Sequence, residues 1–134
     1  MSKPTRTTRS RAPRKMTARD FALLGTFDPP SEKEARDQRI RAMIQSITRG
    51  KVASYSQVAA AAGYPMYQRQ VARVLRTSHA GLPWQRVVGA GGFIKTKMHL
   101  ALEQRLMLEM EGVRFIGKHV DLAAHQHVFR TWEL

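Results

Sequence analysis

The sequence predicts a mainly α fold, a winged helix-turn-helix with a minor β-hairpin. Capping boxes open two helical segments, a tight glycine-containing turn separates two short helices, and a later glycine-rich turn has β-prone residues on both sides. The chain has 134 residues, and domains cluster near roughly 100 to 150 residues. We therefore expect a single folded domain over residues 20–134, preceded by an arm over residues 1–19.

Basic side chains dominate the N-terminal arm. Its charged residues are all positive: Lys3, Arg6, Arg9, Arg11, Arg14, Lys15 and Arg19. A stretch so poor in apolar residues buries too little surface to offset the entropy lost on ordering, so we expect a flexible arm. A solvated tail without a specific role is the alternative, because basic arms tolerate any polyanion.

The first helix is predicted over residues 32–48. A short apolar segment at residues 21–27 comes before it, and two prolines then stop the chain. Ser31 and Glu34 make a capping box, after which apolar residues recur at helical spacing. Gly50 is expected to end this helix.

Two short helices joined by a tight turn are predicted next, over residues 55–62 and 67–75. Ser54 and Gln57 form a second capping box, and the turn begins at Gly63. This arrangement is the outline of a helix-turn-helix, with an ordinary helical hairpin as the alternative.

A β-hairpin is predicted after the two helices, where residues 82–88 and 93–95 flank a glycine-rich turn. It would form the wing of a helix-turn-helix. A last helix is predicted over residues 100–110, because Leu102, Leu106 and Met110 recur at helical spacing. Gly112 is placed to terminate that helix. From residue 113 onward the pattern weakens, and only residues 120–122 hint at extended structure.

Composition narrows the classes of function. The chain has 23 Lys and Arg against 10 Asp and Glu, a net charge of +13, and subtracting the seven charges of the arm leaves +6. A basic balance favours a polyanionic partner, with nucleic acid ahead of a membrane surface or an acidic protein. The absence of cysteine excludes disulfides, thiolate metal sites and a cysteine nucleophile.

The sequence carries no signal for a membrane or a metal. No apolar run approaches the roughly 20 residues of a membrane span, and no signal peptide is recognised at the N-terminus. A soluble, cytoplasmic protein is therefore expected. The five histidines show no spacing typical of metal ligands, so no metal site is assigned.

Four segments in order resemble a known family. They are residues 50–59, the turn Gly63-Tyr64-Pro65 with Arg69 after it, the run Pro83-Trp84-Gln85-Arg86-Val87-Val88, and the pair Glu111-Gly112. Over residues 40–113 the chain resembles the DNA-binding domain of O6-alkylguanine-DNA alkyltransferases. It is more closely similar to their non-catalytic relatives, the alkyltransferase-like proteins.

The chain departs from the alkyltransferases at the reactive site. Alkyl transfer needs a thiolate and a neighbouring histidine base, and Trp84 and Gln85 stand in their places. An indole N–H only donates, and a carboxamide does not titrate usefully, so no transfer to this chain is expected. The segment 96–99 also lacks the paired glycines that close the alkyltransferase pocket, which implies a differently shaped pocket.

The resemblance implies particular roles for three residues. Trp84 would form a wall against a flipped base, Tyr55 is similar to the tyrosine that presses on the flipped nucleotide's backbone, and Arg69 resembles the arginine that fills the vacated space. The expected lesion pocket comprises Tyr55, Pro83, Trp84, Arg86 and Lys97. The expected DNA-binding residues are Ser54, Tyr67, Gln68, Arg69 and Arg73. The family uses the minor groove, where a small-residue face at Ala59, Ala60 and Ala72 would permit close approach.

Several of these residues also have a purely structural interpretation. Trp84 follows a proline and can be a packing residue. Arg69 can be a solvated side chain or a phosphate contact, and Lys97 can be solvated. Arg86 can brace its loop, and Glu111 can be a structural acid at a helix end, since no cysteine is left for it to serve.

The resemblance implies a non-enzymatic sensor that binds and flips O6-alkylguanine in double-stranded DNA and marks it for nucleotide excision repair proteins. Such binding could also shield lesions from genuine alkyltransferases. A monomer without a cofactor is expected. Two other classes stay open: an enzyme that removes the alkyl group or the base with Glu111 and a water, and a winged-helix transcription regulator that prefers an undamaged sequence.

Overall fold

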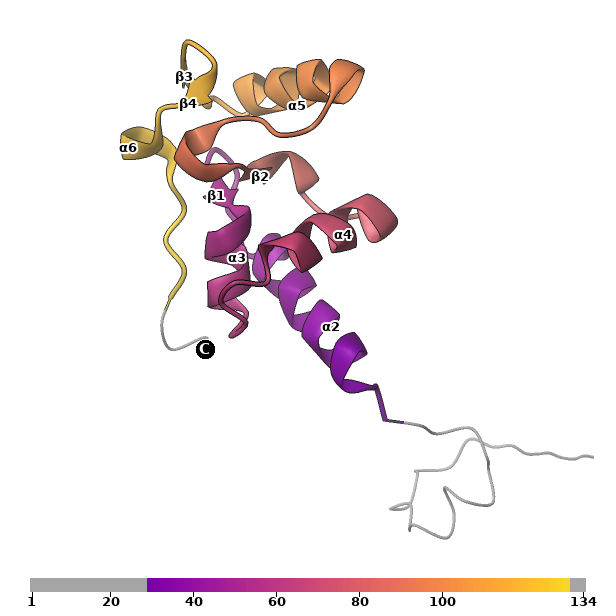
Figure 1. Ribbon diagram of the computed structural model, residues 1–134. Coiled ribbons are helices and arrows are strands. Elements are labelled where there is room, and N and C mark those ends of the chain that lie inside the picture. The colour runs from indigo at the N-terminus through magenta and orange to yellow at the C-terminus, as the bar shows by residue number, and fades with distance from the viewer. Residues whose placement is uncertain (1–28, 131–134) are drawn as a thin grey trace, which may run out of the picture. The chain divides into compact units, whose positions relative to one another are not determined.

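The computed structural model describes residues 29–130, and the fold in this range is mainly helical, as predicted (Figure 1). The predicted arm at residues 1–19 and the apolar segment at residues 21–27 lie outside the described residues, so both stay predictions. With the labels of Figure 1, the helices are α2 (Glu32–Gln45), α3 (Tyr55–Ala61), α4 (Gln68–Ser78), α5 (Met98–Met110) and α6 (Leu122–His125). The strands are β1 (Ala53–Ser54), β2 (Val87–Val88), β3 (Phe115–Ile116) and β4 (His119–Val120).

The capping box at the start of α2 is confirmed. The Ser31 hydroxyl accepts the Glu34 N–H at 3.1 Å, and the Glu34 carboxylate accepts the Ser31 N–H at 2.8 Å. The helix ends at Gln45, earlier than predicted, and Gly50 does not terminate it. Gly50 does adopt a φ of +82°, but it uses this conformation in the loop that leads to β1, where its N–H is bound by Glu111.

Helices α3 and α4 form the predicted helical pair. Ser54 and Gln57 close the second capping box, and Gly63 turns the chain with a φ of +94°. Helix α4 runs on to Ser78, three residues beyond the predicted end. Both helices pack on α2 in a core whose buried members include Ile40, Ile44, Val58, Ala59, Val71 and Val74. Each such aliphatic side chain of Val or Ile size contributes about 1.5 to 3 kcal/mol to folding.

The predicted small-residue face is only partly present. Ala59 is fully buried in the core between the helices, so it cannot meet a ligand. Ala60 is exposed and Ala72 is half-buried. The alanine at position 59 therefore serves the close packing of α3 against its neighbours.

The position predicted for the hairpin was wrong. Strand β2 pairs in parallel with β1, with Ala53 opposite Val87 and Ser54 opposite Val88, and residues 89–92 fold back locally through a bond from Gly89 N–H to the Phe93 carbonyl. Both valines of β2 are buried, which favours pairing inside the domain over an exposed wing. The antiparallel hairpin is formed by β3 and β4 around the left-handed Gly117.

Helix α5 faces the core with a side that the sequence did not predict. Leu102, Leu106 and Met110 do recur at helical spacing, but they are 75%, 58% and 72% exposed. Gln104 and Leu108 point inward instead, because Gln104 finds backbone carbonyls to bind there. With Met98 at 82% exposure, the outward residues make an exposed apolar stripe along α5.

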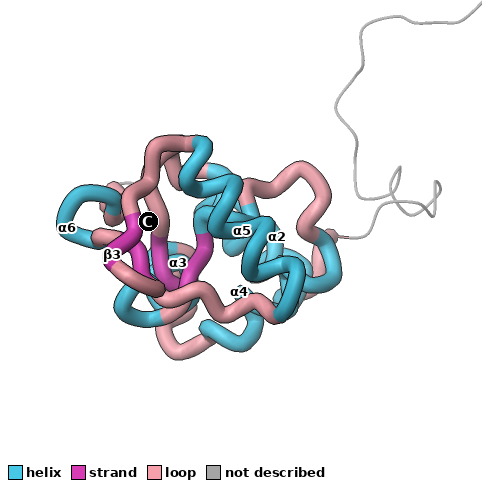
Figure 2. The backbone as a smooth tube through the Cα atoms, turned by 90° about the horizontal axis from the view of Figure 1, so that it is seen from above, coloured by secondary structure: helices cyan, strands magenta, loops and turns pink. Residues whose placement is uncertain are grey.

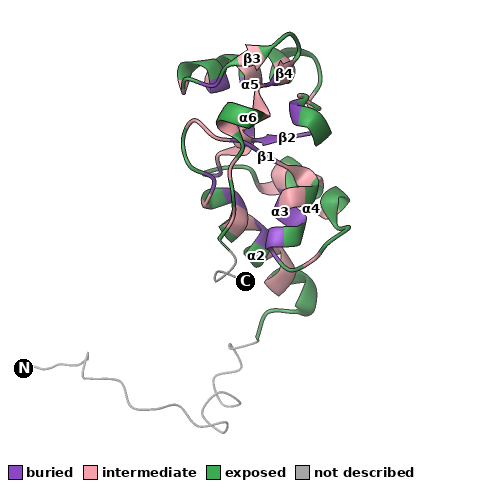
Figure 3. Cartoon of the chain, turned by 90° about the vertical axis from the view of Figure 1, so that its left-hand side faces the viewer, coloured by how far each residue is buried: buried purple, intermediate pink, exposed green. Residues whose placement is uncertain are grey.

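The short strands lie between α5 and α6, as the view from above shows (Figure 2). A second group of buried residues forms around them: Val52, Val88, Leu108, Val113 and Val120. Figure 3 shows the buried positions along α2, α3 and the strands. Within residues 29–130, no helix is both long enough and apolar enough to cross a membrane.

Candidate nucleic-acid interface

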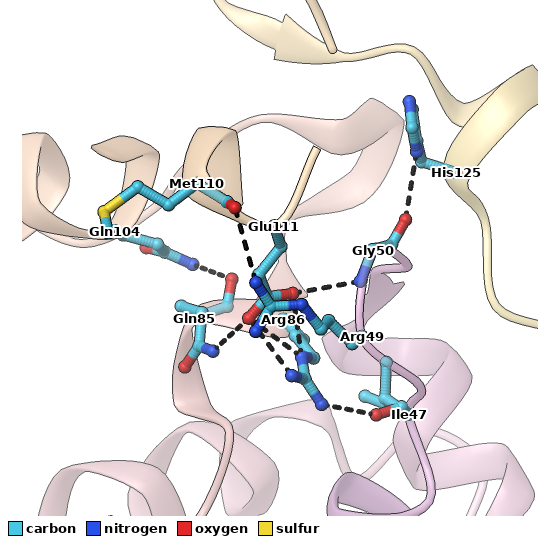
Figure 4. Close-up of polar contacts among 9 residues, drawn as sticks. All are labelled: Ile47, Arg49, Gly50, Gln85, Arg86, Gln104, Met110, Glu111 and His125. Atoms are coloured by element: carbon cyan, nitrogen blue, oxygen red, sulfur yellow. Dashed lines mark hydrogen bonds and ion pairs between the residues drawn. The ribbon is translucent and has the colours of Figure 1, made fainter. Parts of the chain in front are cut away.

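Glu111 is the centre of a hydrogen-bond network that joins three segments of the chain (Figure 4). Gln85 donates from Nε2 to Glu111 Oε2 at 2.7 Å, and the Gly50 N–H donates to Oε1 at 3.0 Å. Arg86 donates from Nε to Oε1 at 3.0 Å and from Nη2 to Oε2 at 3.1 Å. The carboxylate therefore ties the end of α5 to the segment before β2 and to the loop before β1.

The environment of Glu111 keeps it ionised. Burial alone raises the pKa of its carboxyl, but hydrogen bonds from Arg86, Gly50 and Gln85, with the positive charge of Arg86, lower the pKa below its ordinary value. A carboxylate with a lowered pKa and both oxygens occupied is a poor general base. The interpretation of Glu111 as a structural acid at a helix end fits this geometry.

Arg86 is part of this network. Its side chain is 17% exposed, and beyond Glu111 it donates from Nη1 to the Ile47 carbonyl at 2.9 Å. These contacts fit the interpretation that Arg86 braces its loop. Its assignment to a lesion pocket stays a prediction.

Trp84 opens a short 3₁₀ turn, Trp84–Arg86, that leads directly into β2. Its ring is half-buried and stands edge-on to the His79 ring, with 6.5 Å between centroids. Pro83, just before it, is half-buried, whereas Gln85, just after it, is turned inward and only 7% exposed. Within this turn, Gln85 is therefore buried while the neighbouring Trp84 remains partly accessible.

Gln104 is a supporting residue that the sequence analysis missed. It is 1% exposed, and its Nε2 donates to the Gln85 carbonyl at 3.0 Å and to the Val87 carbonyl at 2.9 Å. Its Oε1 accepts the Thr96 hydroxyl at 2.8 Å. One side chain of α5 therefore fixes both the backbone around Trp84 and the start of the segment 96–99. The sequence carried no signal for this role, because the carbonyls that Gln104 binds reach α5 only in the assembled fold.

Ser54 and Tyr55 lie at the start of α3. The Ser54 hydroxyl accepts the Gln57 N–H at 3.1 Å and lies 3.2 Å from the Ser56 hydroxyl, so it is engaged as a helix cap. Tyr55 packs partly against the core, and burial raises the pKa of its phenol. A neutral phenol can donate a hydrogen bond to a phosphate oxygen without repelling it.

Helix α4 presents its predicted DNA-binding residues to solvent. Gln68, Arg69 and Arg73 are exposed, and no ion pair within residues 29–130 engages either arginine. Tyr67 is 46% exposed, with the Arg36 guanidinium 5.6 Å from its ring centroid. This helix therefore offers a basic surface with an aromatic residue at its start, a combination typical of nucleic-acid binding.

The structure brings most of the predicted site together. Ser54 pairs with Val88 across the two-stranded sheet, so the start of α3 lies beside the segment that carries Trp84. Helix α3 in turn packs on α4, which carries Arg69 and Arg73. Lys97 is exposed just before α5, and Gln104 links its neighbour Thr96 to the Trp84 turn.

Comparisons with known proteins point to one family. The family model for the DNA-binding domain of 6-O-methylguanine DNA methyltransferase matches residues 35–113 of the chain. The DNA base-flipping protein of Vibrio parahaemolyticus is 40% identical over 84 residues, covering 60% of this chain and 84% of that protein. The DNA base-flipping protein of Escherichia coli is 35% identical over 105 residues, covering 73% of this chain and 81% of that protein.

A solved structure has the same fold. The crystal structure of Schizosaccharomyces pombe Atl1 in complex with damaged DNA containing O6-carboxymethylguanine matches with a TM-score of 0.61 and 24% identity, covering 69% of this chain and 94% of that chain. At this identity the likeness concerns the fold alone. Because the family model spans more than half of the sequence and two base-flipping relatives align over most of their own length, the chain belongs to the family of the 6-O-methylguanine DNA methyltransferase DNA-binding domain, as an alkyltransferase-like protein.

Proposed function

We propose that this chain is a non-enzymatic DNA damage sensor. It binds duplex DNA, turns an O6-alkylguanine out of the stack and marks it for nucleotide excision repair. The observation that carries the proposal concerns the two positions where the resembling alkyltransferases have their reactive cysteine and its histidine. Trp84 and Gln85 stand there, and Gln85 donates to Glu111 at 2.7 Å. The names of the relatives, base-flipping proteins and a protein solved with damaged DNA, support the same function.

The site lacks the groups that alkyl transfer needs. Trp84 has no thiolate to accept an alkyl group, and the Gln85 amide donates its hydrogen bond to Glu111. Glu111 in turn is engaged by three residues and has a lowered pKa. This geometry also disfavours hydrolysis by a water that Glu111 would activate.

Binding energy in this mechanism comes from stacking and charge. Extruding a base costs a few kcal/mol, and stacking on an aromatic side chain returns roughly 1 to 3 kcal/mol per base. The partly accessible Trp84 ring supplies such a wall, and the exposed Arg69 fills the space that the base leaves. Tyr55 contacts the backbone of the flipped nucleotide from the start of α3.

The direct test is the affinity for matched duplexes with and without a single O6-methylguanine, followed by recovery and analysis of the DNA. The proposal requires tighter binding of the alkylated duplex and recovery of the lesion unchanged. A dealkylated or abasic product would instead identify an enzyme. A preference for one undamaged sequence over the lesion would identify a transcription regulator.

The arginine of α4 gives the first mutational prediction. Replacing Arg69 with alanine should weaken binding to the alkylated duplex more than binding to the undamaged duplex, because a residue that enters the stack acts only when a base is flipped. A phosphate contact would weaken both to the same extent. Titrations with both duplexes measure the two losses. Arg76→Ala, an exposed arginine in the last turn of α4, is the matched control. Equal losses on both duplexes would remove Arg69 from this role.

A second prediction concerns residues 1–19, which carry seven positive charges. Deleting them should lower affinity for any duplex and make its salt dependence shallower, because each neutralised phosphate adds about 0.9 to the slope of log affinity against log salt. Preference for the lesion should be retained. Binding measured over a series of salt concentrations checks this. An unchanged slope would make the segment a solvated tail.

A further inference from the structure

Met66 stands at the tip of the turn between α3 and α4 in an unusual conformation. Its φ is +76°, in the left-handed region that favours glycine, and its side chain is 84% exposed. A side chain with a Cβ atom is strained at this φ, and an exposed apolar side chain gains little from burial in return. Folding alone therefore gives no reason for a methionine here. A strained, exposed residue beside a binding surface points to a role in that binding.

The turn holds Met66 on a rigid base. The Tyr67 N–H donates to the Tyr64 carbonyl at 3.1 Å, and the two tyrosine rings meet edge to face with centroids 5.7 Å apart. Tyr64 packs against the buried core, and Arg36 lies over the Tyr67 ring. The residues on either side of the tip are thus anchored to α2 and to the core.

Three arginines lie on the elements next to this apolar tip. Arg69 follows three positions later in the first turn of α4, Arg73 lies one turn further along that helix, and Arg36 lies beside Tyr67. A partner that offers phosphates to the arginines and an apolar surface to the methionine is a stacked duplex. Proteins that bend DNA insert apolar wedges, methionine among them, between neighbouring base pairs.

We infer that Met66 is a second wedge. Its thioether side chain enters the base step beside the one that Arg69 occupies, partly unstacks it, and opens the duplex around the extruded base. This inference rests on the proposed function, because it assigns the wedge to the same encounter with DNA. It adds a residue whose contribution is unstacking, distinct from filling the vacated space.

The test compares Met66→Gly with the unaltered chain. Glycine removes the side chain and also relieves the backbone, so this variant should unfold at the same or a higher temperature. Local unstacking is read from the fluorescence of 2-aminopurine placed next to O6-methylguanine, and bending from energy transfer between dyes at the two duplex ends. We expect the variant to lose most of both signals and to bind the alkylated duplex about 5- to 20-fold more weakly.

Two further variants define the interpretation. Met66→Leu keeps an apolar wedge of similar size and should retain both signals, whereas Met110→Ala, another exposed methionine at the far end of α5, should change neither. Full 2-aminopurine and bending signals in Met66→Gly would overturn the inference even if the unaltered chain recognises the lesion. If the unaltered chain does not prefer the lesion, the proposed function fails by itself, and a loss of bending in Met66→Gly on any duplex still supports the wedge.

Discussion

Replacing Trp84 with cysteine is expected to weaken lesion binding without creating a transferase. The substitution removes a partly accessible aromatic wall, and base stacking on such a wall is worth roughly 1 to 3 kcal/mol, or about 5- to 150-fold in Kd. A free thiol with a pKa near about 8.5 is only a few per cent ionised at neutral pH, and Gln85 cannot take its proton. Titration with alkylated duplex and transfer of a labelled methyl group measure the two effects.

The double change Trp84→Cys with Gln85→His is the informative companion. Gln85 already donates to Glu111 at 2.7 Å, so an imidazole at this position would find an acid in place to orient it. We expect labelled methyl to transfer measurably faster to the double variant than to Trp84→Cys. We expect the segment 96–99, which lacks the paired glycines of the alkyltransferase pocket, to limit that rate. Rapid methylation of Trp84→Cys alone would show that the pocket is already built for transfer. Unchanged lesion affinity of Trp84→Cys would show that Trp84 is a packing residue.

The second large effect is on stability. Glu111→Gln is expected to lower the free energy of unfolding by about 2 to 4 kcal/mol, because losing one partner of a buried ion pair costs about 3 to 5 kcal/mol and Arg86 keeps some access to water. Urea denaturation measures this loss. Glu109→Gln is the matched control, since Glu109 makes an exposed pair with Arg105 and its loss should cost less than about 1 kcal/mol. Equal stabilities for the two variants would refute the bracing role of Glu111.

The ion pair between Arg86 and Glu111 also predicts that the stability of the fold depends on pH. The folded chain holds the pKa of Glu111 below its ordinary value, so the folded state binds its proton less readily than the unfolded state does. This contribution to stability is present above the ordinary pKa and is lost as the pH falls toward the lowered one. The difference in unfolding free energy between the unaltered chain and Glu111→Gln should therefore narrow on acidification. A difference in unfolding free energy that stays constant on acidification would contradict a lowered pKa of Glu111 in the folded chain.

Local signals predicted the parts of the fold that local interactions determine. Both capping boxes formed because their partners are three residues apart, so Ser31 meets Glu34, and Ser54 meets Gln57, as soon as the first turn closes. The turn at Gly63 was recognisable for the same reason. These signals also predicted that Tyr55 begins α3 and that Arg69 and Arg73 lie on α4, whereas their roles in DNA binding stay predictions.

Contacts between distant segments could not be predicted in this way. Val87 and Val88 have the composition of a hairpin strand, yet their partner is Ala53–Ser54, more than thirty residues earlier. The face of α5 depends on Gln104, whose partners are the carbonyls of Gln85 and Val87. Only the assembled fold supplies those carbonyls, so the leucine spacing pointed to the wrong face.

The exposed apolar stripe of α5 has a consequence for how the molecules behave together. At low ionic strength, a net charge of +13 keeps copies of the chain apart. Added salt screens that repulsion, with a Debye length of about 8 Å at physiological ionic strength. It leaves the attraction between apolar surfaces such as Leu102 and Leu106 in force. The colloidal stability of the free protein therefore depends on its charge, and salt that releases it from DNA also brings it closer to self-association.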